Sequence, residues 1–562
     1  MLVKTYGSAV CGIEAMTVTI EADVSPGLNF HLVGLPDNAV RESQQRISTA
    51  VQSVGMNIPG KRIVVNMAPA DIRKEGSAYD LPLALAVLAA SEQIDSRFLD
   101  GTLCMGELAL DGTLRPVKGA LSMALHAKEE GFARCIFPLD SAREAAVVEG
   151  IDVYGVTHLV QVLDLVEGYP GLEPLRADEP ADFVASSAGG SPAGSATDFP
   201  AGHSAGHSAG HSAGHLTGSP AGPLAAAVPV GSRLGSTAAS PVGQTDPDFA
   251  QVRGQAQARR ALEVAAAGGH NVLMSGPPGA GKTFMARCLP GILPPLTFAE
   301  AIETTRIWSV SGLPRKEQGL MRNRPFRAPH HTSSVVSLTG GGAHALPGEI
   351  SLAHNGVLYL DELPEFSSTA LEVLRQPLED GTIRLSRARY KVDYPARFML
   401  VASMNPCPCG FKGHPARECV CAPYEIRRYE NKVSGPLMDR MDIHLTVKSV
   451  DVEDLLPDKG FVAQAEDSQT IRVRVERARA LQQKRFEGIK GVHTNAQIPV
   501  ALLPVFCELD NASRAFLKQA LERLHLSARA HHRILRLART IADLDGSAAL
   551  QLHHLAEAVQ YK

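Results

Sequence analysis

A glycine-rich segment at residues 271–283 contains the residue types that bind a nucleotide phosphate. It reads NVLMSGPPGAGKT, an apolar run that leads into the pattern Gly-x-x-x-x-Gly-Lys-Thr. Glycines let the backbone wrap around an anion with its N–H groups inward, the lysine reaches the β- and γ-phosphates, and the threonine hydroxyl coordinates Mg²⁺. The pattern therefore predicts a site for ATP and Mg²⁺ made by Gly276, Pro277, Pro278, Gly279, Ala280, Gly281, Lys282 and Thr283.

An apolar run that ends in two carboxylates follows at residues 356–362, GVLYLDE. In this arrangement Asp361 holds the magnesium through water, and Glu362 orients and polarises the attacking water. Strands often end in acidic residues, so the motif is weak by itself. Its combination with the phosphate loop makes it a specific indication of ATP hydrolysis.

Three further residues have the chemistry to read and stabilise the charge of a transferring phosphate. Asn405 ends a third apolar run, FMLVASMN, where it is suited to contact the γ-phosphate or the attacking water. Arg440, in SGPLMDRMDIHL, is a candidate arginine finger that reaches a neighbouring subunit. Arg529, near the start of a helical pattern, is expected to touch the γ-phosphate from a lid. For either arginine, a solvated salt bridge is the alternative.

The elements that must position these residues change character along the chain. Residues 1–168 mix short β-branched runs with DLPLALAVLAA, which predicts a compact α/β domain. Residues 169–245, rich in Ala, Gly, Ser and Pro, predict a flexible, disordered low-complexity linker. Strand, loop and helix alternate over 246–455, and 456–562 is nearly all helical. The predicted fold class is α/β, with an ATP-binding core and a C-terminal helical lid.

The linker contains the repeat AGHSAGHSAGHSAGH, which spaces His203, His207, His211 and His215 four residues apart. In a helix these side chains would share one face and could bind a metal, but the repeated glycine disfavours a helix. A low-complexity spacer without a function of its own is the favoured interpretation.

Composition limits the location and the partners of the chain. At 562 residues it is too long for one core, so roughly two to four domains are expected. The net charge of −4 requires that any DNA-binding surface be local. No run of about eighteen apolar residues occurs, and Glu14 interrupts the N-terminal stretch, so neither a membrane span nor a signal peptide is expected. Well-separated, reduced cysteines then predict a cytoplasmic protein.

The order of phosphate loop, acidic strand, asparagine, finger arginine and lid arginine resembles that of the AAA+ ATPases. The segments RPFRAPHHTSSVVSLTGGGAHALPGEISLAHNGVLYLDELPEF and PLEDGTIRLSRARYKVDYPARFMLVASMNPCPCG are similar to the YifB/ComM family of the Mg-chelatase-like branch. GLPDNAVRESQQRI and ARTIADLDGS extend the resemblance to both ends, whereas the linker is longer and more repetitive than the family pattern. The resemblance implies a homo-oligomer, a hexameric ring helicase that drives branch migration of DNA during natural transformation, with Arg440 completing a neighbour's site.

The first domain is similar to the proteolytic domain of Lon. KEGSAYDLPLALAV parallels the nucleophile loop, and GELALDGTLRPVKGAL parallels the segment with the catalytic lysine. The catalytic positions then fall at Ala78 and Leu121, with Ser77 and Lys118 nearby. A protease of this kind needs a hydroxyl and an activating amine within hydrogen-bond reach. We therefore expect a catalytically inactive Lon-protease-like domain, kept for assembly or for DNA contact.

Four of the nine cysteines fall within fifteen positions, as two Cys-x-Cys pairs: Cys407, Cys409, Cys419 and Cys421. Four thiolates suit tetrahedral Zn²⁺, and a tight loop with no core of its own needs such a clamp. The favoured prediction is thus a structural zinc. Because the usual zinc spacing is Cys-x-x-Cys, free thiols are the alternative.

Basic residues concentrate around this cysteine loop. Residues 384–432 contain ten Lys or Arg and four acidic residues, a local balance of +6, and GTIRLSRARYKVDY predicts a two-stranded hairpin. RNRPFRAPHH adds a further cationic run with Arg322, Arg324, Arg327, His330 and His331. Such loops around an ATP site are expected to face the hole of a ring and grip DNA phosphates without reading sequence. A solvated basic face is the alternative.

Three functions therefore compete. The first is an ATP-hydrolysing motor on branched or single-stranded DNA, and the second is the motor subunit of a Mg-chelatase, which inserts Mg²⁺ into a porphyrin. The Lon-like domain and the cysteine loop favour the first, because chelatase motor subunits do not share them. The third function, an ATP-dependent protease, would require Ser77 to act as a nucleophile.

Overall fold

The computed structural model describes residues 2–71, 74–176, 247–314, 319–342, 344–386, 391–414, 417–449 and 466–562. Most of the predicted linker, including the histidine repeat, lies outside these residues, as does the predicted boundary at residue 455. Two chain-terminal parts with separate hydrophobic cores are described, residues 2–176 and residues 247–562.

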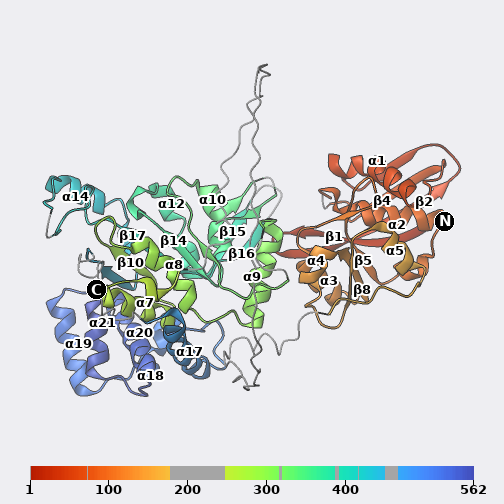
Figure 1. Cartoon of the computed structure of the whole chain (residues 1–562). Coiled ribbons are helices and arrows are strands. Elements are labelled where there is room, and N and C mark those ends of the chain that lie inside the picture. Colours follow the sequence, from red (N-terminus) through yellow and green to blue (C-terminus); the bar gives the residue numbers. More distant parts are fainter. Residues whose placement is uncertain are drawn as a thin grey trace, which may run out of the picture. The chain divides into compact units, whose positions relative to one another are not determined.

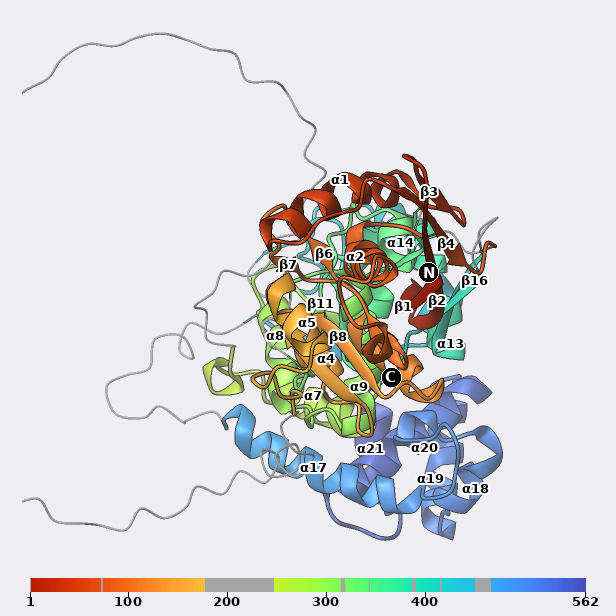
Figure 2. The ribbon, with the colours of Figure 1, turned by 90° about the vertical axis from the view of Figure 1, so that its right-hand side faces the viewer.

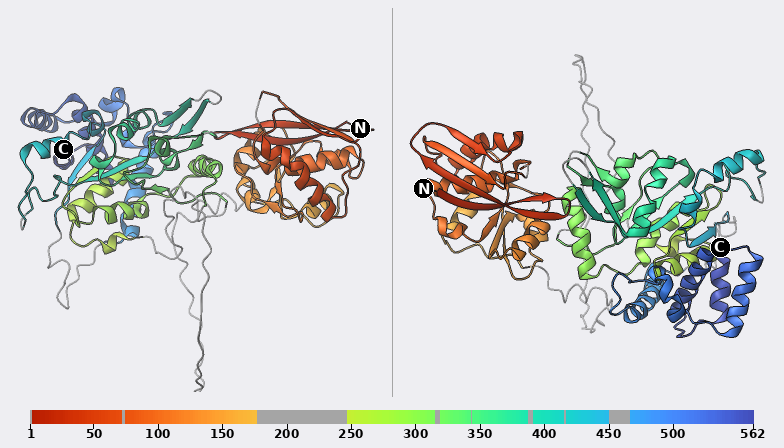
Figure 3. Two further views of the ribbon diagram at one scale, coloured as in Figure 1. Left: turned by 90° about the horizontal axis from the view of Figure 1, so that it is seen from above. Right: turned by 180° about the vertical axis from the view of Figure 1, so that it is seen from behind.

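The N-terminal part is built on a mixed seven-stranded sheet. Its strand order is β3 (Phe30–Val33), β4 (Arg62–Ala68), β2 (Glu14–Ser25), β1 (Leu2–Cys11), β5 (Thr102–Cys104), β8 (Arg134–Pro138) and β9 (Asp152–Val156). The antiparallel pair β1–β2 forms the long hairpin of this part (Figure 3). The sheet packs with α2 (Asp80–Ala90), α3 (Ala120–Glu129), α4 (Leu139–Ala145) and α5 (Leu159–Val166), and α1 (Asn38–Ser53) packs on α2.

Helix α2 contains the run DLPLALAVLAA, and every one of its residues is buried. A helix that is apolar on all sides stays folded only inside a core. Its neighbours there include Ile20 on β2, Val65 on β4 and Leu103 on β5. The compact α/β fold predicted for this part is confirmed.

The second part contains a five-stranded sheet that is parallel throughout. Its order is β11 (Phe326–Arg327), β14 (Val357–Leu360), β17 (Met399–Met404), β10 (Val272–Ser275) and β18 (Ile443–Thr446). Nearly all residues of β10, β14 and β17 are buried, as expected for a sheet covered on both faces. Helices α7 (Ala256–Gly268), α8 (Lys282–Ile292) and α9 (Phe298–Ser311) belong to this part (Figure 1).

Several short elements are inserted around this sheet. They are α10 (Val335–Thr339), β12 (Gly340–Gly341), β13 (Leu346–Pro347), α11 (Glu349–Leu352), α12 (Ser368–Glu372), α13 (Arg375–Asp380), α14 (Pro423–Glu430) and α15 (Gly435–Met438). The predicted hairpin is present as the antiparallel pair β15 (Thr382–Ser386) and β16 (Lys391–Pro395). One face of it is buried through Ile383, Leu385, Val392 and Tyr394.

The C-terminal region is helical, as predicted. It consists of α17 (Ser468–Arg485), α18 (Leu503–Phe506), α19 (Asn511–Arg523), α20 (Ala528–Leu544) and α21 (Leu552–Gln560), which lie together in Figure 2. Val475 on α17, Leu537 on α20 and Leu555 on α21 share one core with Leu262 on α7. The helical region therefore packs directly on the nucleotide-binding part. Among the residues described above, no helix has both the length and the hydropathy needed to cross a bilayer.

A buried charge cluster fixes the interior of this helical region. Asp543 is fully buried and lies 2.7 Å from Arg485 Nη1 and 2.9 Å from Arg539 Nη2. Asn495 Nδ2 also donates to this carboxylate, at 2.7 Å. Five donor atoms thus converge on one side chain from three segments, because Arg485 and Arg539 each contribute two nitrogens.

We predict that Asp543→Ala destabilises the chain by about 3–5 kcal/mol, because it leaves two largely buried guanidinium groups without a counter-ion. Urea unfolding followed by circular dichroism measures the loss. Glu522→Ala is the control, because Glu522 is an exposed acid on α19 whose ion pair with Lys518 is worth little. Equal stability of the two variants would contradict this account of the cluster.

Candidate ATP site and the cysteine loop

The parallel register brings the three predicted motifs to one edge of the sheet. Ser275 pairs with Met404, and Leu360 pairs with Ala402, so β10, β14 and β17 end at nearly the same level. Residues that follow these strands meet at the carboxyl edge, where ligands bind in open α/β sheets. The phosphate loop, the acidic pair and Asn405 are therefore neighbours in space.

The glycines of the phosphate loop are required by its backbone. Gly279 and Gly281 have φ values of 77° and 82°, in the left-handed region that favours glycine. A Cβ at Gly276 would lie only 2.3 Å from the carbonyl oxygen of Val447. The loop therefore turns tightly between β10 and α8, and the N-terminus of α8 opens toward the position of a bound anion.

Lys282 is the first residue of α8, and its side chain is the most enclosed cation of the site. Its Nζ donates to the carbonyl oxygens of Gly276 and Pro277 at 2.6 and 2.8 Å, and to Asn405 Oδ1 at 3.2 Å. Burial lowers the pKa of Lys282, and the nearby charges of Asp361 and Glu362 oppose that shift. The ammonium group thus joins the phosphate loop to the residue predicted to sense the γ-phosphate.

Asp361 forms the centre of a hydroxyl network. Thr283 Oγ1 donates to Asp361 Oδ2 at 2.8 Å, and the Ser403 hydroxyl donates to the other carboxylate oxygen. Burial raises the pKa of Asp361, but the hydrogen bonds from Ser403, Thr283, Tyr359 and the backbone of Glu362 together outweigh burial and lower it overall. Asp361 is thus held as a carboxylate beside a hydroxyl, which is the oxygen ligand set that Mg²⁺ prefers.

Two residues of this network escaped the sequence prediction. Ser403 lies on β17, and the buried Tyr359 lies on β14, with its hydroxyl 3.1 Å from Ser403 Oγ and 3.3 Å from Thr283 Oγ1. Each is two positions before a predicted site residue, Asn405 or Asp361. Side chains two apart on a strand share a face, and this alternation was the signal available in the sequence.

Glu362 stands in a different environment from its neighbour. Its backbone is left-handed, with φ of 52°, and its side chain is 55% exposed, so the carboxylate is open to water. His331 Nδ1 lies 3.5 Å from Glu362 Oε2 and comes from the loop after β11. The sequence prediction grouped His331 with the DNA-contacting cations, whereas the structure places it beside Glu362, the carboxylate expected to activate water.

Arg440 and Arg529 lie at the opposite edge of the sheet. Asn271, which precedes β10, donates to the carbonyl oxygen of Arg440 at 3.0 Å, whereas the phosphate loop follows β10. Four residues of strand separate these edges by about 13 Å. The Arg440 guanidinium pairs with Glu379 and donates to Pro436.

Arg529 belongs to the same edge, because its Nη1 lies 3.0 Å from Asp439 Oδ2, next to Arg440. Repulsion from neighbouring arginines adds to burial in lowering the pKa of Arg440. The structure therefore brings the two predicted arginines close to each other and leaves both away from Lys282 of the same chain. Their catalytic roles remain predictions.

Two arginines of the cationic run RNRPFRAPHH are paired within the chain. Arg324 donates to Glu300 at 2.9 Å and to the carbonyl oxygens of Pro294 and Asn355. Arg327 forms a two-point ion pair with Glu349 at 2.6 and 2.7 Å. Both side chains are at most one-fifth exposed. Carboxylates distant in the sequence therefore already neutralise these two arginines, and DNA contact by this run stays a prediction.

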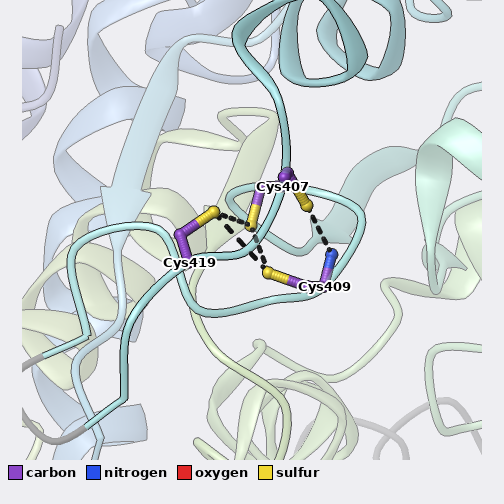
Figure 4. A group of neighbouring side chains, drawn as sticks. Cys407, Cys409 and Cys419 are labelled. Atoms are coloured by element: carbon purple, nitrogen blue, oxygen red, sulfur yellow. Dashed lines mark hydrogen bonds between the residues drawn. The ribbon is translucent and has the colours of Figure 1, made fainter.

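The four clustered cysteines come together after β17. Cys407, Cys409, Cys419 and Cys421 place their sulfur atoms within 4.8 Å of one another. The Sγ–Sγ distance is 3.4 Å between Cys407 and Cys409, and each of these two lies 3.6 Å from Cys419 (Figure 4). No pair is a disulfide.

The Lon-like positions of the N-terminal part have no serine–lysine pair at Ser77. The Ser77 hydroxyl donates to the carboxylate of Glu107. Leu121 is fully buried in the core, and Lys118 is exposed. These partners agree with the expected loss of peptidase activity, which stays a prediction.

Comparison with known proteins identifies the class. Family models of magnesium chelatase subunit ChlI match residues 20–141 and 248–455, and a model of its C-terminal region matches residues 465–562. The fold and the site thus define a Mg-chelatase-like AAA+ ATPase, a class that uses ATP and Mg²⁺.

Full-length relatives identify the family. The chain is 39% identical to the uncharacterized protein YifB of Escherichia coli, over 99% of this chain and 96% of that protein. It is also 39% identical to the competence protein ComM of Haemophilus influenzae, over 100% of this chain and 97% of the relative. Lon protease 2 of Bacillus subtilis is 26% identical over 23% of each chain. The chain belongs to the YifB/ComM family.

We predict that Glu362→Gln lowers the rate of ATP hydrolysis by about 10²–10⁴-fold, because an amide cannot accept the proton of the attacking water. Nucleotide affinity is expected to stay near that of the wild type, since the phosphate loop is unchanged. Steady-state hydrolysis and binding of a fluorescent ATP analogue measure the two effects. Glu365→Gln, at an exposed acid paired with Lys432, should hydrolyse ATP normally. Full activity of Glu362→Gln would exclude its role.

Proposed function

We propose that this protein is a ring-forming ATPase that translocates on DNA and promotes branch migration of recombination intermediates, such as those of natural transformation. The observation that carries the proposal is the continuity between the ATP site and an exposed basic surface. Asn405, which contacts Lys282, is followed after one residue by the cysteine loop, and that loop leads into α14.

The two arginines at the amino edge support a ring. Arg440 and Arg529 lie about 13 Å or more from the phosphate loop along the strand direction. In a head-to-tail ring, this edge of one subunit faces the carboxyl edge of the next. Each subunit then supplies its arginines to the ATP bound by its neighbour, and the family resemblance indicates six subunits.

The DNA-binding surface in this proposal is the α14 face, defined as Arg417, Val420, Tyr424, Arg427 and Arg428. Val420 and Tyr424 are 86% and 67% exposed, and the three arginines are exposed as well. Tyr424, Arg427 and Arg428 follow the three- and four-residue spacing of one helix face. Arginines neutralise phosphates without reading sequence, and an exposed aromatic ring stacks on any base.

A second contact ties α14 to the sensor. Tyr429 is buried, which raises its pKa to about 12, and the backbone of Asn405 lies close enough to its hydroxyl to oppose that shift. A displacement of Asn405 on hydrolysis would therefore be transmitted to α14 through both the chain and this contact. This is the proposed path from ATP hydrolysis to DNA movement.

The alternative is a chelatase-type motor subunit. Two findings favour it: the match to the ChlI family models, and a sequence identity of 31% to the magnesium-chelatase 67 kDa subunit of Heliobacterium mobile. That similarity covers only 30% of this chain, whereas the YifB and ComM relatives match along its whole length. We therefore rank the DNA motor first.

We predict that branched DNA raises the ATPase rate of the full chain and that the chain moves the branch point of a four-way junction. The triple variant Tyr424→Ala/Arg427→Ala/Arg428→Ala should lose this stimulation. Its two missing arginines should reduce the slope of log affinity against log salt by about 2. Hydrolysis assays measure the ATPase rate, and gel assays of strand exchange measure movement of the branch point. Lys282→Ala should abolish both ATP hydrolysis and branch-point movement.

The control is Lys518→Ala/Arg523→Ala, which removes exposed cations from α19 and should leave DNA stimulation in place. If forked, four-way and single-stranded DNA all leave the ATPase unchanged while a porphyrin-carrying partner raises it, the chelatase alternative is correct. Casein digestion that Ser77→Ala abolishes would instead indicate a protease.

A further inference from the structure

We propose that the four thiolates of the cysteine loop bind one Zn²⁺ and that the metal-bound loop forms a wall of the phosphate loop, so that nucleotide affinity depends on zinc. The inference rests on the ATP site and not on the DNA role. If the inference is correct, ATP hydrolysis requires a structural Zn²⁺ in addition to the Mg²⁺ that accompanies ATP. The observations that carry it are the sulfur geometry and a contact between Gly410 and Pro278.

The spacing of the sulfur atoms fits a tetrahedral zinc ion. With Zn–S bonds of about 2.3 Å, two thiolates of a tetrahedron lie about 3.8 Å apart. The Sγ–Sγ distances among Cys407, Cys409 and Cys419 are 3.4, 3.6 and 3.6 Å. Cys421 completes the set, with all four sulfurs within 4.8 Å of one another. A disulfide would need about 2.05 Å, so the cluster matches ligation rather than oxidation.

Backbone groups around the sulfurs stabilise thiolate charge. Lys412 N–H donates to Cys407 Sγ at 3.3 Å, and Cys409 N–H donates to Cys421 Sγ at 3.3 Å. Backbone N–H groups that donate to the ligand sulfurs orient them and offset the negative charge that four thiolates leave on a divalent ion. Because four protein ligands close the coordination sphere, the metal has a structural role.

The loop has almost no apolar core of its own. Of its described residues, 407–414 and 417–421, only Cys407 and Gly410 are buried. Gly410 and Gly413 have φ values of 83° and 76°, so the chain reverses tightly between the ligands. A segment that buries so little apolar surface gains its order from the free energy of metal binding.

The buried turn of this loop lies against the phosphate loop. A Cβ placed on Gly410 would be 2.7 Å from Cδ of Pro278, so the backbone of Gly410 packs against the Pro278 ring at a distance that leaves no room for a side chain. Gly276 N–H also donates to the carbonyl oxygen of Met404 at 3.2 Å, just before the cysteine loop begins. Loss of the metal would release Gly410 and leave Pro278 without this support.

The proposal is tested on the purified full chain without DNA. Elemental analysis should find about one zinc per chain, and Cys409→Ser/Cys419→Ser should lower this at least tenfold. The same variant, and wild type treated with a zinc chelator, should bind a fluorescent ADP analogue roughly tenfold more weakly, since the wall of the phosphate loop is gone. Added zinc should restore the affinity of the chelated wild type, which separates metal loss from misfolding.

Two control variants test whether the cysteine loop is the zinc site and whether zinc loss causes the change in ADP affinity. Cys11→Ser, outside the cluster, should keep both zinc and affinity. Replacing His203, His207, His211 and His215 by alanine should also leave about one zinc per chain. A chain that holds no zinc and takes up none, or that holds iron, overturns the metal site. Zinc-free chains with unchanged ADP affinity overturn the coupling to the phosphate loop. Neither outcome bears on DNA translocation.

Discussion

The parallel alignment of β10, β14 and β17 is the constraint on which the site depends. Because these strands end at one level, the phosphate loop, Asp361 and Asn405 meet without any long connection. Because the strands are parallel, the residues that directly precede each strand lie at the opposite, amino edge of the sheet. Arg440 precedes β18 and is therefore excluded from the ATP site of its own chain.

Packing and electrostatics then tune the groups at the carboxyl edge. Lys282 is nearly buried and is satisfied by loop carbonyls and by Asn405, so the phosphate loop and the sensor form one hydrogen-bonded unit. Asp361 is fixed by hydroxyl groups, while Glu362 next to it faces water. Adjacent carboxylates in unlike environments can take unlike roles, one holding a metal and the other activating water.

The sequence was most informative where one local pattern determines both backbone and chemistry. The phosphate loop, the apolar strand before Asp361 and the hairpin β15–β16 needed only short-range signals of glycine, alternation and turn residues. The run of ten apolar residues after Asp80 likewise predicted the buried helix α2. The class and the family followed from those segments, and the comparisons confirm them.

Contacts between segments that are distant in the chain could not be predicted from the sequence. Arg324 and Arg327 looked like free cations, because nothing local indicates that Glu300 and Glu349 neutralise them. Ser403 is an ordinary strand residue until the parallel pairing places it against Asp361.

The predicted linker and its histidine repeat lie almost wholly outside the described residues, so that expectation stays open. The domain boundaries and the catalytic roles likewise remain predictions.

The central claim is that each ATP is hydrolysed between two subunits. Mixing Arg440→Ala, which keeps its phosphate loop, with Lys282→Ala, which keeps its arginine, tests it most directly. Each variant alone should be inactive. Rings that contain both should regain ATPase activity, because an intact phosphate loop then meets an intact arginine across an interface. Full activity of Arg440→Ala alone, or mixed rings as inactive as their parents, would contradict the account.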